Sequence, residues 1–356
     1  MGVVELSVDE SRWRTLVEAH PDGLVYHHPA WIETLHAAYG YEPLVLGAEE
    51  DGGALAGVLP LMRKRGLATG KRLSSLPHTP VAGPLASDPG AAKALTEAAA
   101  ARAHAERGTG LELKSAATLD AADGALEGGA WSTSYSLPLP ASVDELRFGN
   151  SRNHGRIKWA VNKASRSGVE VREAKSEEEL ARWHRLYLET MRWHVVPPRP
   201  YAFFRAAWEI LRPPGLMRLL LAERAAGGES RIIAGSMLFT GSATVLYAYN
   251  GRAASELASR PNDVIQWHAI HDAVAAGARQ YDFGEVEEDQ QGLTEFKKKW
   301  GAQPVTLYRY TLKDGKRGRT PSSGSPGRAR RLAERVWRRL PLPVTERLGA
   351  AAYRRL

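Results

Sequence analysis

Apolar residues follow two different spacings in the first part of this 356-residue chain. Over 30–39 they recur with the period of a helix, which places Trp31 and Leu35 on one face. The runs at 44–46 and 54–61 are short, apolar and separated by a Gly-containing turn, so we expect two strands. The chain therefore begins as a mixture of helices and strands.

A segment rich in Pro, Gly and Ser follows at 73–90. It contains too many apolar residues for a free linker, so we expect an ordered loop that lies close to a functional site. An Ala-rich helix over 90–107 and a strand over 109–115 complete the elements expected before position 140.

The region after position 140 continues this mixture. It opens with Ser142 and Glu145 in the spacing of a capping box, and Pro197 and Pro198 end its longest helix. Three successive strands are then followed by alternating helices and strands, an order typical of an α/β (α+β) fold with a mixed sheet. The expected helices cover 149–168, 176–194, 201–211, 261–276 and 293–300, and the expected strands cover 169–174, 216–223, 231–240, 243–250, 280–283 and 305–311.

The length of the chain predicts two domains, at roughly 150 residues each. We place them at 1–140 and 141–312. A linker rich in Gly, Ser and Pro is expected at 313–327, and a basic amphipathic helical tail at 328–356. No internal sequence repeat relates the two domains.

The positive charge is concentrated at the C-terminal end. The whole chain carries a formal charge of +8, whereas residues 313–356 alone contain 13 Lys and Arg against 3 Asp and Glu. The remainder is therefore close to neutral, and the tail accounts for the basic character of the chain.

The sequence contains no cysteine, which excludes disulfides, thiolate nucleophiles and Cys-ligated zinc. No apolar run is long enough to span a membrane as a helix, and the acidic first residues do not resemble a signal peptide. We therefore expect a cytoplasmic protein with no bound metal and no resident cofactor.

Residues 281–310 contain several short motifs in a fixed order. The matching positions are Asp282-Phe283-Gly284, Gly292-Leu293, Phe296-Lys297 and Trp300-Gly301. In this order they resemble the FemAB family of GNAT-like acyltransferases, which form amide bonds on cell-wall precursors. The resemblance covers most of 20–310 and is firmest over 145–310.

The resemblance implies two tandem GNAT-like halves, each with a central mixed sheet and flanking helices. It places the active site where the halves meet, and it implies an N-acyltransferase, in which an amine attacks an activated carbonyl. Such an enzyme must hold both reactants together, stabilise the negative charge on the carbonyl oxygen and remove a proton from the nitrogen.

The family has a lysine at the reaction centre that corresponds to Lys297. The resemblance therefore implies that Lys297 stabilises the carbonyl oxygen, with Phe296 and Asp282 beside it. Because Lys298 and Lys299 follow directly, the alternative is a solvated helix face. Adjacent residues on a helix point about 100° apart, so at most one of the three lysines is expected to face a site.

The role of proton acceptor stays open. The candidates are Asp282, Glu285, Tyr249, His268 and His271. His268 and Asp272 form an HxxxD pattern known from another class of acyltransferases. Here the pattern lies within a helix among apolar residues, so polar residues on a helix surface are the simpler interpretation.

Acetyl-CoA enzymes of the GNAT fold bind the donor pyrophosphate at a helix N-terminus, where free backbone N–H groups reach the phosphates. At the matching place this chain has Arg260, Pro261 and Asp263. The proline has no N–H and the aspartate adds negative charge, so the phosphate-binding turn is expected to be absent. This favours aminoacyl-tRNA, the donor that the resemblance implies, over acyl-CoA.

A basic stripe on the expected helix 149–168 suits such a polyanionic donor. Its members recur at i, i+4, i+11 and i+14, and they are Arg152, Arg156, Lys163 and Arg166. We expect these four residues to bind tRNA, and an ordinary solvated helix face is the alternative.

The resemblance also implies residues that bind the substrates. They are Arg192, Arg199, Tyr249, Trp300 and Gly292. Family members bind a diphosphate-containing murein precursor with basic residues, which Arg192 and Arg199 match. The lysine that the family places a few residues past Trp31 is missing here, so a small amine or a peptide is an equally good acceptor.

Three functions remain open. The first is an aminoacyl-tRNA-dependent acyltransferase that acts on a cell-wall precursor or an amine metabolite. The second is an acyl-CoA-dependent GNAT N-acetyltransferase, and the third is a non-catalytic accessory protein of envelope polysaccharide assembly. If the acceptor is a lipid-linked murein precursor, we expect the basic tail to contact the inner face of the membrane; the alternative is that it packs back on the enzyme.

Overall fold

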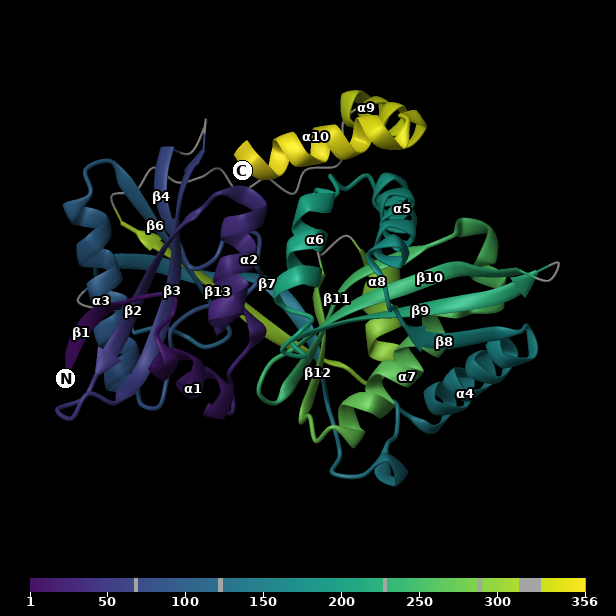
Figure 1. The fold of residues 1–356 in the computed structure, drawn as a ribbon, viewed down its shortest axis with the longest axis horizontal. Coiled ribbons are helices and arrows are strands. Elements are labelled where there is room, and N and C mark those ends of the chain that lie inside the picture. The colour runs from purple at the N-terminus through teal and green to yellow at the C-terminus, as the bar shows by residue number, and fades with distance from the viewer. Residues whose placement is uncertain (67–69, 121–123, 227–228, 287–289, 314–327, 356) are drawn as a thin grey trace.

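The computed structural model describes residues 1–66, 70–120, 124–226, 229–286, 290–313 and 328–355. One sheet of 13 strands runs through the molecule in the order β1-β2-β3-β4-β6-β13-β7-β12-β11-β10-β9-β8, with β5 paired to β3 (Figure 1). The strands are β1 (Gly2–Leu6), β2 (Glu42–Glu49), β3 (Leu55–Gly66), β4 (Gly70–Ser74), β5 (Leu85–Ala86), β6 (Thr109–Ser115), β7 (Leu126–Pro138), β8 (Val169–Glu173), β9 (Met217–Ala226), β10 (Glu229–Thr240), β11 (Thr244–Arg252), β12 (Gln280–Val286) and β13 (Gln303–Leu312).

The two ends of this sheet repeat one pattern. From one edge, β1 to β4 pair antiparallel in sequence order and β4 then pairs with β6 in parallel. From the other edge, β8 to β11 do the same and β11 pairs with β12 in parallel. The repeat therefore lies in the topology, although no sequence repeat is visible, and the expected α/β fold with two similar halves is confirmed.

In the middle of the sheet, the last strand of each half pairs with a strand of the other half. β7 follows β6 in the chain but pairs with β12, and β13 follows β12 but pairs with β6. β7 and β13 also pair with each other along most of their length. The domain boundary at 140 remains a prediction, because the sheet is continuous across both halves.

The helices pack on both faces of the sheet. Asp88, Asn150 and Ser176 cap α3, α4 and α5 with their side chains, as expected for these residue types at a helix start. The helices are α1 (Ser11–Ala19), α2 (Pro29–Tyr39), α3 (Pro89–Ala105), α4 (Ser151–Arg166), α5 (Glu177–His194), α6 (Tyr201–Ile210), α7 (Pro261–Ala275), α8 (Gln291–Lys299), α9 (Arg328–Arg339) and α10 (Leu342–Arg355), with short 3-10 turns at Val25–His27, Val143–Glu145 and Ala254–Ser259.

The largest core joins the two halves. α2 from the first half packs against α6 from the second, above the centre of the sheet (Figure 1). Trp31 makes edge-on ring contacts with Phe203 and Phe239, at centroid distances of 5.9 and 5.0 Å, and all three side chains are buried. Elsewhere α3 covers β2, β3 and β6, while α4 and α7 pack together beside the second half of the sheet.

The C-terminal tail forms two helices that pack on the folded body. α9 contacts α5, and α10 contacts α5 and β3, so that α10 lies across both halves (Figure 1). Most of the predicted linker, 314–327, lies outside the described residues. In the described part of the chain, no helix is both long and apolar enough to cross a membrane.

Candidate active site

The parallel strands β11 and β12 separate in the middle of the second half. Their last paired residues are Leu246 and Asp282, after which β11 continues beside β10 and β12 continues beside β7. Gly284, with a φ of 78°, lies at an irregularity of β12 just past this point. The separation frees the edge of β12 that faces β11, and side chains can reach its backbone there.

Lys297 on α8 occupies this place. Its side chain is 2% exposed, and its Nζ donates hydrogen bonds to the carbonyl oxygens of Gly284, at 2.7 Å, and Glu285, at 3.0 Å. An ammonium group has three N–H donors, so these two bonds leave one for a ligand atom. Burial lowers the pKa of Lys297 to about 8, against the opposing effect of the carboxylates of Asp282 and Glu285.

Asp282 supports the same turn of β12. Its Oδ1 accepts hydrogen bonds from the Ser134 hydroxyl and from the backbone N–H of Gly284, both at 2.7 Å. Burial raises the pKa of Asp282, while these two hydrogen bonds act in the opposite direction. The carboxylate therefore fixes the backbone that presents two carbonyl oxygens to Lys297.

Two serines of β7 contribute to the site, although the sequence did not indicate them. Ser134 holds Asp282, and the Ser132 hydroxyl donates to Glu285 Oε2 at 3.2 Å. Glu285 is exposed, unlike Asp282. The signal that was available is a run of hydroxyls at alternate positions of 131–137, which is how one face of a strand appears in a sequence.

The two neighbouring lysines point elsewhere. Lys298 has a side chain 52% exposed and lies 4.0 Å from Glu295. Lys299 forms an ion pair with Asp263 at the start of α7. Only Lys297, of the three, faces the separated strands, in agreement with the helical geometry.

An open cavity of about 560 Å³ lies between α8 and the strands β7 and β12. It is lined by Lys298 and not by Lys297, so it lies beside the separated strands and not within them. Its lining residues are Thr133, Tyr135, Val286, Gln291, Thr294, Glu295 and Lys298.

Three further predicted site residues, Phe296, Trp300 and Gly292, lie on α8 or at its end, and each has different surroundings. Phe296 is half-buried and contacts the rings of Phe283 and Trp300. Trp300 is fully buried against Phe148, at a ring distance of 4.8 Å, so it offers no surface to a substrate in this structure. Gly292 is exposed in the first turn of α8. The structure does not bring Trp300 or Gly292 to the other predicted substrate-binding residues.

The start of α7 is closed by residues of the chain itself. Pro261 occupies the first turn, and Arg260 before it adopts a left-handed conformation with a φ of 60°. The carboxylate of Asp263 is buried there and is paired with Lys299. The position at which a donor pyrophosphate would bind therefore already holds a negative group and its counterion.

The HxxxD pattern on α7 is structural. The carboxylate of Asp272 accepts from Arg218 Nη2 at 2.9 Å, which anchors α7 to β9. His271 Nδ1 lies 2.7 Å from the carbonyl oxygen of Trp267 within the same helix. His268, the histidine of the pattern, is exposed on the helix surface, as the simpler interpretation of the pattern expected.

Arg199 is buried between the two halves. Its guanidinium lies 4.6 Å from the ring of Phe203 and 5.3 Å from that of Tyr249, and it donates to the hydroxyl of Tyr39 at 3.1 Å and to the backbone carbonyl of His78. Among the residues that the structure describes, no carboxylate pairs with it. A buried cation without a counterion is costly, and this arrangement is typical of a site for an anion.

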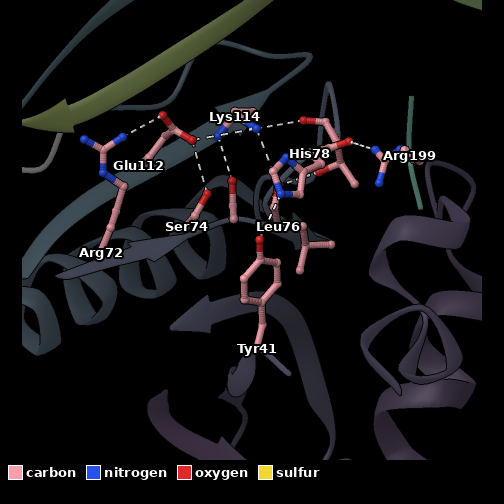
Figure 2. A network of polar contacts seen from close by, with 10 residues as sticks. Tyr41, Arg72, Ser74, Leu76, His78, Glu112, Lys114 and Arg199 are labelled. Carbon is pink, nitrogen blue, oxygen red and sulfur yellow. Dashed lines mark hydrogen bonds and ion pairs between the residues drawn. The ribbon is translucent and has the colours of Figure 1, made fainter. Parts of the chain in front are cut away.

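The first half contains a counterpart of the separated strands, and its own loop fills it (Figure 2). β4 and β6 pair in parallel up to Ser74 and Glu112, and the expected ordered loop then follows β4. Lys114 Nζ donates to the carbonyl oxygens of Thr79, at 2.8 Å, and Leu76, at 3.4 Å, and lies 3.7 Å from the carboxylate of Glu112. In the first half, therefore, the chain's own loop is held at the point where the parallel strands separate, whereas in the second half Lys297 of α8 lies there.

The tip of this loop is directed at Arg199. Leu76 and His78 have positive φ values of 60° and 63°, a conformation that costs energy in residues other than glycine and recurs at functional sites. His78 Nε2 lies 2.9 Å from the hydroxyl of Tyr41. Burial and then the charge of Arg199 lower the pKa of His78 to about 2, so this side chain is neutral at physiological pH.

Arg192, the second predicted arginine, lies at the end of α5 and not beside Arg199. Its Nη1 donates to the carbonyl oxygen of Leu340, at 3.1 Å, in the C-terminal tail. The next residue, Trp193, accepts a hydrogen bond from Arg338 at its backbone carbonyl, at 3.2 Å. Arg192 therefore holds the tail in this structure.

The basic stripe lies on the surface of α4. Arg152, Arg156 and Arg166 are exposed, and Lys163 is half-buried. Lys163 Nζ lies 5.4 Å from the centre of the Trp159 ring, and the guanidinium of Arg260 lies 5.7 Å from the same ring. Trp159, which is 51% exposed, was not foreseen from the sequence; an exposed aromatic ring beside cations is a feature of nucleic-acid-binding surfaces.

The two similar halves, each with a pair of parallel strands that separate, agree with the tandem GNAT-like fold that was expected. Residues 151–298 match the family described as an acetyltransferase (GNAT) domain. This match covers the α4–α8 region, in which Lys297 and the start of α7 lie. The predicted resemblance and the predicted class of enzyme, an amide-forming acyltransferase, are confirmed.

Solved structures share the whole fold. FemX superposes with a TM-score of 0.68 at 17% identity, over 87% of this chain and 97% of FemX. The C-terminal domain of a putative lysylphosphatidylglycerol synthetase from Agrobacterium fabrum gives 0.56 at 12% identity, over 86% and 92%. L-PGS from Bacillus licheniformis gives 0.56 at 9% identity, over 98% and 99%. A comparison with curated proteins finds no significant match.

Proposed function

We propose that this chain transfers the aminoacyl group of an aminoacyl-tRNA to the amine of an anionic acceptor. The observation that carries the choice of donor is the start of α7, where the ion pair of Asp263 and Lys299 lies at the position at which a donor pyrophosphate would be expected. The basic stripe on the surface of α4 and the nearby Trp159 support a nucleic-acid donor.

The reaction forms one bond and breaks one. The acceptor nitrogen attacks the ester carbonyl of the aminoacyl-tRNA, a C–N bond forms, and the C–O bond to the terminal ribose breaks. The proton lost by the nitrogen ends on the ribose hydroxyl that leaves. In this scheme Lys297 donates its third N–H to the carbonyl oxygen while that oxygen carries negative charge.

The acceptor is proposed to bind at Arg199 through a phosphate or carboxylate group. Its buried and unpaired guanidinium suits an anion, and Tyr249 and Tyr39 flank it. The resemblance to the FemAB family points to a cell-wall precursor, and one structural neighbour, a putative lysylphosphatidylglycerol synthetase, is named for a phospholipid. We therefore place a lipid-linked or nucleotide-linked cell-wall precursor first among the acceptors, and an amine metabolite second.

A donor screen tests this proposal. Purified enzyme would be incubated with a mixture of amine acceptors and either charged tRNA or acetyl-CoA, and amide products would be followed by mass spectrometry. We expect product with charged tRNA only, and no heat of binding with acetyl-CoA at tens of micromolar in calorimetry. Micromolar binding of acetyl-CoA would contradict the proposal and favour the second candidate below.

The second candidate is an acyl-CoA-dependent N-acetyltransferase. It is favoured by the match of residues 151–298 to an acetyltransferase (GNAT) domain. Lys297 would have the same role in it, so the two candidates differ only in the donor.

A further inference from the structure

The C-terminal helix α10 packs over Arg199, where the acceptor pocket is proposed. Its packing positions, Leu342, Thr345, Gly349 and Tyr353, recur with the spacing of one helix face. Thr345 is fully buried, and a Cβ atom at Gly349 would lie only 2.2 Å from the carbonyl oxygen of Pro198. The glycine therefore permits a close approach, and α10 docks through a shaped contact surface.

Tyr353 lies directly against the groups of the proposed acceptor pocket. Its ring lies 5.1 Å from the Arg199 guanidinium, stacks on Tyr39 at 6.3 Å and meets His78 edge-on at 4.7 Å. Its backbone carbonyl accepts a hydrogen bond from the Tyr41 hydroxyl, at 2.9 Å, and lies 3.1 Å from His78 Nε2. Figure 2 shows Tyr41 and Arg199, each joined to His78. These are the groups that would otherwise contact a ligand.

The tail also engages the other predicted arginine, because Arg192 donates to the carbonyl of Leu340. Both arginines are thus contacted by neutral groups of the tail: Arg199 by the ring of Tyr353 and Arg192 by the carbonyl of Leu340. The charge of Arg199 stays without a counterion while α10 is docked. An anionic ligand would supply that counterion, so it has an electrostatic advantage over the tail.

We propose that α10 is an internal occupant of the acceptor pocket, which an anionic acceptor must displace. The inference rests on the acceptor site proposed above. A tethered segment competes at an effective concentration on the order of millimolar, and the apparent affinity of the acceptor falls by the fraction of molecules in which the pocket is open. The tail thereby keeps the pocket closed until an acceptor is present.

The test uses full-length variants and inorganic pyrophosphate as the anionic probe. Gly349→Leu places a side chain where a Cβ already collides with Pro198, so it undocks α10, and leucine preserves the helix because it is a better helix former than glycine. Leu348→Ala is the matched control, since Leu348 is exposed on the adjacent position. Calorimetry should show pyrophosphate binding at least tenfold tighter for Gly349→Leu than for the unchanged chain or for Leu348→Ala.

A second measurement follows the movement of α10 directly. The chain has no cysteine, so Thr345→Cys introduces one buried thiol and Leu348→Cys one exposed thiol on the same helix. Pyrophosphate should accelerate the reaction of Thr345→Cys with a thiol reagent at least tenfold and leave that of Leu348→Cys unchanged.

The outcomes separate the two proposals. Equal pyrophosphate affinity of all three proteins, with no change at Thr345→Cys, overturns the role of α10 and leaves the acceptor site intact. No binding by any of them, Gly349→Leu included, overturns the acceptor site at Arg199. Arg199→Gln in the Gly349→Leu background should abolish binding, and persistence of binding there would place the anion elsewhere.

Discussion

Lys297 is a buried cation whose two hydrogen bonds to the carbonyl oxygens of Gly284 and Glu285 tie α8 to β12 at a cost in hydration. A lysine that is 2% exposed must give up most of its hydration, and the lowered pKa reflects this cost. The neighbouring Phe296 and Trp300 already supply the apolar contacts between α8 and the core. A buried cation held by two carbonyl oxygens at the point where strands separate is best explained by chemistry at that point.

The motif at 281–310 and the 100° rotation between helix neighbours were enough to single out Lys297 from the sequence. Its partners were not predictable in the same way. They are backbone carbonyls of Gly284 and Glu285, which become available only because β11 and β12 separate after Asp282. The point at which two strands stop pairing depends on contacts between distant parts of the chain, so it leaves no pattern in the local sequence.

The first prediction concerns this lysine. Lys297→Ala should lower kcat by about 10²–10³, the usual cost of losing one donor to a developing oxyanion. Because the protonated form is the donor and its pKa is about 8, kcat of the unchanged enzyme should fall as the pH rises through about 8. Steady-state kinetics over pH 6 to 9.5 measure both effects.

Lys298→Ala is the matched control, since Lys298 is exposed on the same helix. It should retain kcat within about twofold, and the residual activity of Lys297→Ala should lack the decline above pH 8. Circular dichroism would check that both variants fold. Equal small losses in the two variants would remove Lys297 from the mechanism.

At the scale of elements, the two halves share one topology, but a different element lies at the separated strands in each half. β4 and β6 separate after Ser74 and Glu112, as β11 and β12 separate after Leu246 and Asp282, so a carboxylate residue stands at the same register position in each half. In the first half the loop after β4 is held there by Lys114. The loop was predictable from its composition, but its position at the separated strands depends on Lys114, some 35 residues away in sequence.

β7 is an example of a strand that the sequence did not predict. This strand, Leu126–Pro138, lies in the middle of the sheet and was not predicted. Its sequence is rich in Gly and Ser: three serine hydroxyls bond to Gln280, Asp282 and Glu285 of β12, while of its apolar residues Tyr135 and Leu137 are buried in the core of the second half. The apolar positions are few and are separated by Gly, Ser and Thr, so the hydrophobic alternation of this strand is weak in the sequence.

The second prediction concerns α4. Replacing Arg152, Arg156, Lys163 and Arg166 by Ala should weaken tRNA binding and flatten the plot of log affinity against log salt concentration. For every phosphate that the variant no longer neutralises, the slope should fall by about 0.7–0.9. Filter binding over a range of salt concentrations measures the slope.

A control of equal charge uses exposed cations of other elements. The four residues are Lys175, Arg182, Arg185 and Arg205, on or before α5 and α6. Their replacement by Ala should leave the salt slope nearly unchanged. If both quadruple variants change the slope equally, tRNA binding depends on net charge and the stripe on α4 has no special role.

At the scale of the whole molecule, the charge distribution predicted a distinct tail but not where it docks. The contacts that place α10 join residues more than a hundred positions apart, such as Tyr353 with Tyr39 and Gly349 with Pro198. The docked tail leaves one surface basic, because Arg335 and Arg339 on α9 are exposed while Arg338 bonds to the carbonyl of Trp193. The tail can therefore cover the pocket and still present positive charge outward.

This outward surface leads to the last prediction, that α9 binds an anionic membrane surface. Each arginine near an anionic leaflet contributes about 1 kcal/mol, so Arg335→Ala with Arg339→Ala should weaken vesicle binding by roughly 30-fold. Co-sedimentation with vesicles that contain phosphatidylglycerol would compare this variant, the full chain and a truncated chain that ends at Lys313. The full chain should pellet at low salt and be released at high salt, because the attraction is electrostatic and screened.

Since Arg335 and Arg339 are exposed while α10 is docked, Gly349→Leu should pellet to the same extent as the unchanged chain. Equal sedimentation of the full and truncated chains would show that the tail has no part in membrane binding, and a lipid-linked acceptor would then have to be reached from solution.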